Sequence, residues 1–122
     1  MAVTQSRDNR TIIAGADLSA SQFIFVKLDA AAEVVAGTDG DAAFGVLEVG
    51  AATGNACTVT KTGKVMVECG GAVTVGGEVA ADANGKAIDA VNTDVILGTA
   101  YENGVTGQLI AIELSDAGNI KA

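Results

Sequence analysis

The sequence contains no histidine, tryptophan or proline, and its only aromatic side chains are three Phe and one Tyr. Without imidazole it cannot form a His-based catalytic triad, a His-ligated metal site or an HExxH helix. The scarcity of aromatics also disfavours a ligand cleft, because such clefts normally use aromatic platforms. We therefore expect no enzyme activity.

Positive charge is equally scarce: seven Lys and Arg stand against 15 Asp and Glu, a formal net charge of −8. The lysines are scattered, so no basic stripe is present to attract a phosphate backbone, and we expect no nucleic-acid partner. No apolar run approaches the ~20 residues of a membrane span, and the first ten residues contain no run of signal-peptide length. We expect no membrane contact and synthesis in a cytoplasm.

Small and β-branched residues fill the sequence instead: Ala, Gly, Val and Thr together account for 65 of the 122 positions. This composition, with short apolar segments between turn residues, predicts an all-β fold, a compact β-sandwich or barrel-like domain of short antiparallel strands. The polar residues 1–10 predict a flexible N-terminal arm, and residues 11–122 a single β-rich domain.

Ten strands are predicted, at Thr11–Ala14, Phe23–Leu28, Glu33–Ala36, Phe44–Val49, Ala56–Thr60, Lys64–Cys69, Glu78–Ala81, Lys86–Ala90, Asp94–Ala100 and Gln108–Leu114. In Phe23–Leu28 the period of two leaves neither face fully polar, so this strand is expected in a core or at an interface. Glu78–Ala81 and Lys86–Ala90 are expected to pair through a turn at 82–85.

The segment from Cys57 to Cys69 has the clearest alternation. If residues 61–63 form a three-residue hairpin loop, Thr60 pairs with Lys64. One face is then apolar, with Cys57, Val59, Val65 and Val67, and the other carries Thr58, Thr60, Lys64, Met66 and Glu68. In this register the two cysteines are not opposite each other, so we expect free buried thiols; a disulfide needs a shifted register.

Carboxylates near glycines in 37–41 and 82–85 have the composition of calcium loops but not their spacing, so β-turns are the better account. No metal site is expected.

A faint internal repeat appears when the sequence is shifted by 53 positions. The shift places Gly45 on Gly98, and Thr53 and Gly54 on Thr106 and Gly107. In a Gly-rich sequence three identities are compatible with chance, so a duplicated strand pair and coincidence both remain open.

The order of Gly-bounded strands carries a family resemblance. The segments are Ala14–Asp29, Phe44–Gly54, Gly63–Val79, Leu97–Tyr101 and Gly107–Leu114. Together they resemble the small capsid cement, or head decoration, proteins of tailed bacteriophages, although Gly77-Glu78 stands where the family usually has Gly-Asp. The resemblance implies a virion protein that binds the major capsid protein on the outer surface of the assembled head, commonly as a homotrimer, without a cofactor or catalytic residue.

The contact residues expected from this reading are the polar arm and the exposed or interface aromatics: Thr4, Gln5, Arg7, Arg10, Phe23, Phe25 and Tyr101. The arm either orders on the shell, with its arginines pairing acidic capsid groups, or is a disordered tail. Two other readings remain. A trimeric module of a phage head or tail fibre that binds a host glycan would use Tyr101, and a small enzyme would need a clustered carboxylate pair.

Overall fold

The computed structural model describes residues 9–37, 40, 42–114 and 120–121, which form strands and turns and no helix. The strands make two five-stranded antiparallel sheets, one from each half of the chain. Sheet A contains β1 (Asn9–Ile13), β2 (Phe25–Leu28), β3 (Val34–Ala36), β4 (Gly45–Val49) and β5 (Ala56–Thr60). Sheet B contains β6 (Gly63–Glu68), β7 (Glu78–Ala81), β8 (Ala87–Asp89), β9 (Gly98–Ala100) and β10 (Leu109–Leu114). All ten predicted strands are therefore confirmed, and so is the all-β class.

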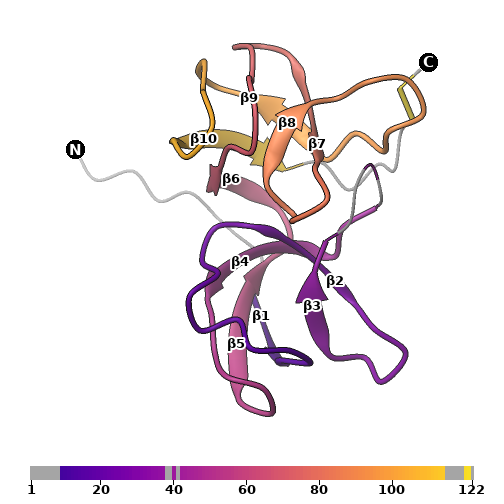
Figure 1. Cartoon of the computed structure of the whole chain (residues 1–122), viewed down its shortest axis with the longest axis vertical. Helices are drawn as coiled ribbons and strands as arrows, with labels where there is room; N and C mark the ends of the chain where they lie inside the picture. Colours follow the sequence, from indigo (N-terminus) through magenta and orange to yellow (C-terminus); the bar gives the residue numbers. More distant parts are fainter. Residues whose placement is uncertain (1–8, 38–39, 41, 115–119, 122) are drawn as a thin grey trace.

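Each sheet forms its own lobe, and the two lobes are stacked along the long axis of the molecule (Figure 1). The order is β1-β5-β4-β2-β3 in sheet A and β6-β10-β9-β7-β8 in sheet B. A parallel bridge from Ala14 to Val34 joins the two edges of sheet A, and one from Cys69 to Ala87 does the same in sheet B. Both sheets are thus partly closed, which confirms the barrel-like form of the expected domain.

The two lobes are copies of one fold, which confirms the internal repeat. Adding five to each strand number of sheet A gives the order of sheet B. The start of β2 at Phe25 and that of β7 at Glu78 lie 53 positions apart, as do the starts of β4 and β9. Left-handed backbone recurs at the same spacing, in the pairs Phe23 and Gly76, Ala32 and Gly85, Gly40 and Thr93, and Gly54 and Gly107. The repeat covers all five strands, more than the strand pair that the sequence suggested.

The β2–β3 and β7–β8 turns show the duplication in detail. The Asp29 carboxylate accepts the N–H groups of Ala31 and Glu33. Asp82, 53 positions later, accepts those of Asn84 and Lys86. The predicted hairpin of β7 and β8, with its β-turn at 82–85, is confirmed. In this turn the Asp82 carboxylate is bound by main-chain N–H groups. The loop at 37–41 lies partly outside the described residues.

The hairpin predicted between Ala56–Thr60 and Lys64–Cys69 is wrong. β5 pairs with β1 and β4, whereas β6 pairs with β10, because the chain crosses from one sheet to the other at residues 61–62. The predicted faces nevertheless hold for the apolar set: Cys57, Val59, Val65 and Val67 are buried. Alternation reports which side of a strand meets a core, and it is the same whichever strand pairs with it.

The two lobes have separate hydrophobic clusters that meet at one point. Ile24, Val26 and Leu47 belong to the cluster of the first lobe. Phe25 and Val46, which are paired across β2 and β4, pack instead into the cluster of the second lobe. The Phe25 N–H also donates to Gly85 O at 2.7 Å, so side chain and main chain together fasten the first lobe to the second.

Candidate interaction surfaces

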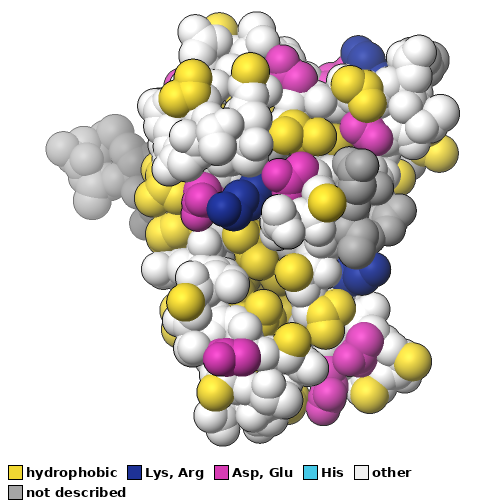
Figure 2. All heavy atoms as spheres, viewed as in Figure 1, with side chains coloured by type: hydrophobic (Ala, Val, Ile, Leu, Met, Phe, Trp, Pro, Cys, Tyr) yellow, Lys and Arg dark blue, Asp and Glu magenta, His cyan; other side chains and the backbone are white. Residues whose placement is uncertain are grey.

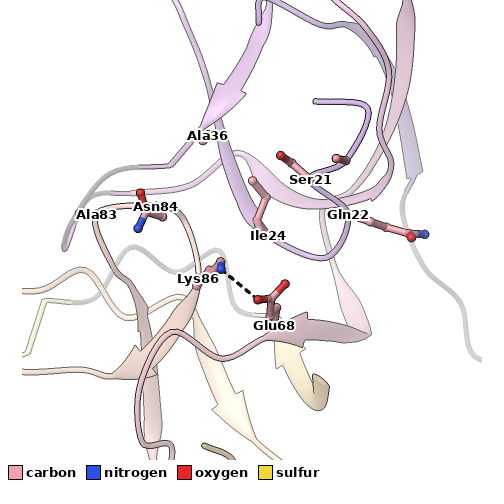
Figure 3. A pocket seen from close by; sticks show the side chains of 9 residues that line it. Ser21, Gln22, Ile24, Ala36, Glu68, Ala83, Asn84 and Lys86 are labelled. Carbon is pink, nitrogen blue, oxygen red and sulfur yellow. Dashed lines mark ion pairs between the residues drawn. The ribbon is translucent and has the colours of Figure 1, made fainter. Parts of the chain in front are cut away.

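A pocket of about 350 Å³ lies between the lobes (Figure 3). Its walls are Ala20, Ser21, Gln22, Ile24 and Ala36 from the first lobe and Glu68, Ala83, Asn84 and Lys86 from the second. Lys86 Nζ is 3.0 Å from Glu68 Oε2, so the two charged side chains of the second-lobe wall form an ion pair. The lining supplies hydrogen-bonding groups around this pair, which suits a polar contact rather than acid–base chemistry.

The outer face of sheet B carries the other notable group of side chains. On the face of Figure 2, charged side chains are spread over both lobes, and hydrophobic atoms show between them. The strand registers give the arrangement on sheet B independently of the view. Met66 pairs with Ala111, and the Tyr101 N–H donates to Ala111 O, so these three residues form a row across β6, β10 and the end of β9.

Leu109 lies one row away on the same face of β10, because alternate residues of a strand share a face. Met66 is 39% exposed, Tyr101 50% and Leu109 42%, while Ala111 beneath them is buried. We call Met66, Tyr101 and Leu109 the platform. It is an exposed apolar group on a regular sheet rather than on a loop tip.

Charged groups hold the ring of Tyr101 in place. Its hydroxyl donates to Glu113 Oε1 at 2.7 Å, and Lys64 Nζ lies 4.7 Å from the ring centroid, in cation–π range. The hydrogen bond to Glu113 raises the pKa of the Tyr101 hydroxyl, with smaller contributions from desolvation and from the Glu113 charge. Tyr101 therefore projects from the sheet with one ring face and its hydroxyl already engaged.

The residues expected at a contact surface are dispersed. Arg10 is exposed in β1, opposite Val59, so this residue and Asn9 belong to a strand and not to the arm. Polarity suggested the arm, but an edge strand is held by main-chain hydrogen bonds that polar residues make equally well. Thr4, Gln5 and Arg7 lie outside the described residues.

The phenylalanines occupy different environments from Tyr101. Phe23 is half-buried with a φ of 65°, and its carbonyl accepts the Glu68 N–H at the lobe junction. Phe25 was expected either in a core or at an interface with a partner. It is fully buried and belongs to the core. Tyr101 alone of these aromatics lies on the platform.

Sequence analysis missed Met66 and Leu109 as partners of Tyr101. Met66 stood out as the one apolar side chain on an otherwise polar face of its strand, and this signal was present in the alternation. The contact between β6, β9 and β10 depends on pairing of β10 with two other strands, one of which, β6, lies more than 40 residues earlier, and alternation does not report such pairing.

The cysteines and carboxylates form no site among the described residues. Cys57 and Cys69 are both free and buried, as expected, and burial raises the pKa of each thiol, with the nearby charges of Glu102 and Glu68 adding to the effect at Cys69. No group of three or more Cys, Asp or Glu in the described ranges is placed to hold a metal ion. The part of the chain that the structure describes contains no helix that could cross a membrane.

Comparison with known proteins gives a structural relation rather than a sequence family. No family model matches the chain, and no curated protein matches it. Among solved structures, the chain is similar to the N-terminal base of the head fibre protein gp8.5 of bacteriophage phi29. The TM-score is 0.71 at 17% sequence identity, and the match covers 93% of this chain and 98% of that one. The chain thus shares the fold of a phage head-fibre base along nearly its whole length.

Proposed function

We propose that the protein is a structural component of a tailed-phage head, a decoration protein bound to the outer surface of the assembled capsid. The observation that carries this proposal is the fold shared with a head-fibre base over almost the whole of both chains. The order of Gly-bounded strands in the sequence supports it independently. The protein would be made in the host cytoplasm and would act by contact, without catalysis or a cofactor.

In this proposal each copy bridges neighbouring major capsid protein subunits and stabilises the shell against the pressure of packaged DNA. The duplicated fold supports bridging, because two stacked lobes present two surfaces at fixed separation. A contact of ~800 Å² per partner is moderate alone. A homotrimer would multiply such contacts and raise the effective affinity by orders of magnitude. Thr4, Gln5 and Arg7 are proposed to add to the contact from the N-terminal arm.

The second candidate is a module of a phage head or tail fibre that binds a host-surface glycan. The similarity to a fibre base and the half-exposed Tyr101 favour it. Against it, Lys64 lies over the Tyr101 ring and Glu113 accepts its hydroxyl, so part of the stacking surface that a sugar uses is taken.

Mixing the purified protein with expanded, undecorated heads of its own phage tests the proposal. We expect the protein to co-sediment with the heads and to raise their melting temperature by several degrees, because a ligand that binds only the assembled shell stabilises it. Failure of both would contradict decoration. Binding of host polysaccharide in place of heads would support the fibre module instead.

A further inference from the structure

The duplication supplies an internal comparison for every surface position of the second lobe. Residues from β2 to β5 correspond to those 53 positions later, since Phe25–Val46 and Glu78–Thr99 are equivalent cross-strand pairs. Residues of β1 correspond to those 55 positions later, because Ile13 pairs with Ala56 as Glu68 pairs with Leu109. A side chain that the fold itself requires should therefore have a similar counterpart in the first lobe.

The first lobe does not repeat the three side chains of the platform. Met66 corresponds to Thr11 and Leu109 to Ala56. Tyr101 lies 53 positions after Glu48, but its place in the register belongs to Val49. The first lobe keeps the same strand order, with Thr11 and Ala56 in place of Met66 and Leu109. A bulge in β4 places the exposed Val49 opposite Thr58, where the second lobe has Tyr101 opposite Ala111. The fold therefore requires neither an aromatic ring at Tyr101 nor the long apolar side chains of Met66 and Leu109, and the exposure of these side chains costs free energy that a contact would recover.

The two lobes also differ in the next row of side chains on the same face. In the first lobe, Phe25 and Val46 occupy this row and are buried against the second lobe. Their equivalents Glu78 and Thr99 are exposed, and Lys121 pairs with Glu78 at 2.7 Å. The row that joins the lobes is thus polar in the second lobe, so the apolar contact of this face is confined to the platform.

Carboxylates surround the platform. Glu113 lies beside Tyr101, Glu102 Oε2 accepts the N–H of Ala111, and Glu68 is paired with Leu109 across β6 and β10. Glu68 is ion-paired with Lys86 and Glu78 with Lys121, which leaves Glu102 and Glu113 beside Lys64 near Tyr101. A second copy of this chain would bring the same excess of carboxylates against them, which like-charge repulsion opposes. A partner with Arg or Lys around an apolar patch is complementary.

We propose that the platform is the docking face of the protein, and that its occupant is a different protein presenting an apolar patch ringed by Arg or Lys. This inference rests on the proposed function, which makes the partner the outer surface of the major capsid protein. Tyr101 and Met66 fill the apolar centre of the contact, and Glu102 and Glu113 meet the basic rim.

The test exchanges the platform for its first-lobe counterparts. The triple variant Met66→Thr, Tyr101→Val, Leu109→Ala installs the residues that the first lobe has at the equivalent places in the strand register, and its melting curve checks folding. We expect its affinity for undecorated heads to fall at least about tenfold, because exposed aromatics at the centre of contacts dominate binding. Wild-type affinity should also fall as salt rises, since the rim attraction is screened.

Two matched variants serve as controls. Val49→Ala removes an exposed apolar side chain from the first lobe and should leave head binding unchanged. Tyr101→Phe keeps the ring and should retain most of the affinity.

The outcomes separate the two proposals. Wild-type protein that fails to sediment with heads overturns the proposed function and the partner named here together. A triple variant that sediments as well as wild type overturns the platform alone. The platform proposal is also overturned if sedimentation velocity shows that the platform mediates a dimer of the free protein, or if host polysaccharide displaces the wild-type protein from heads.

Discussion

Tyr101 shows how one side chain depends on its immediate neighbours. Its hydroxyl donates to Glu113, and that hydrogen bond is the largest cause of the raised pKa. The protonated hydroxyl is the form that donates. The contribution of this pair to stability is therefore complete below the pKa of an unfolded tyrosine, about 10, and is lost as the pH rises through the higher pKa of the folded protein.

This pair gives a prediction that is simple to measure, because Tyr101 is the only tyrosine and no tryptophan is present. Tyrosinate absorbance of the native protein should titrate with a midpoint above about pH 10. In Glu113→Gln the midpoint should move down toward that value, since the charged acceptor is gone. Glu33→Gln, in the first lobe, should leave it unchanged. A midpoint at the ordinary value in wild type would contradict the Tyr101–Glu113 hydrogen bond.

The sequence predicted the locations of some single residues correctly and of others incorrectly. The scarcity of aromatics correctly drew attention to Tyr101. It could not separate Tyr101 from Phe25, because neither face of the strand containing Phe25 is fully polar and the choice between core and surface depends on the other lobe. Arg10 was assigned to the arm by its polarity, although main-chain pairing places it in β1.

Among the elements, the strands were predictable, but of the two strand pairings that the sequence predicted only the β7–β8 hairpin is confirmed. Composition and alternation located all ten strands, because both depend on residues a few positions apart. The false hairpin between β5 and β6 arose because a Lys-Thr-Gly loop suits a hairpin as well as it suits a crossover between sheets. Pairings such as that of Ile13 with Ala56 connect distant segments, which local patterns do not record.

Gly45 and Gly98 test the equivalence of the two sheets at the level of single strands. A Cβ on Gly45 would lie against the carbonyl oxygen of Thr60, and one on Gly98 against that of Glu113, the residue 53 positions after Thr60. Each approach is closer than non-bonded atoms allow, so the partner strand must shift. Gly45→Ala and Gly98→Ala should each lower the free energy of unfolding by about 1–3 kcal/mol.

Urea unfolding followed by circular dichroism measures both variants. Val91→Ala, at an exposed position outside the strands, is the control and should stay within about 0.5 kcal/mol of wild type. If one of the glycine variants matches this control while the other is destabilised, the two sheets do not share the close strand approach described here.

For the whole molecule, the duplication explains both the resemblance between the lobes and their division of roles. The 53-residue shift was detectable because both copies need Thr-Gly in the turns at 53–54 and 106–107 and a glycine at the close strand approaches of Gly45 and Gly98. It did not reveal that Phe25 and Val46 join the lobes while their equivalents, Glu78 and Thr99, face outward. That asymmetry lies in side chains that have diverged, so a search for identities passes over it.

The joining of the lobes through Phe25 predicts how the molecule unfolds. Phe25 fills the second-lobe cluster, whereas Ile24, Val26 and Leu47 hold the first. In wild type we expect the lobes to unfold together. Phe25→Ala should cost about 3–5 kcal/mol and lower the stability of the second lobe more than that of the first, because the cavity opens in the second cluster.

Two probes already present in the chain separate these outcomes in urea. Tyr101 fluorescence reports on the second lobe, and thiol labelling of Cys57 in a Cys69→Ala background reports on the first. The two midpoints should coincide with Phe25 present and separate in Phe25→Ala, with the Tyr101 signal changing at the lower urea concentration. Ile24→Ala is the matched control: its cavity opens in the first cluster, so it should shift the Cys57 midpoint at least as much as that of Tyr101. Coincident midpoints in Phe25→Ala would mean that the main-chain bonds across the junction, such as that from Phe25 N–H to Gly85 O, are enough to keep the lobes cooperative without the buried ring.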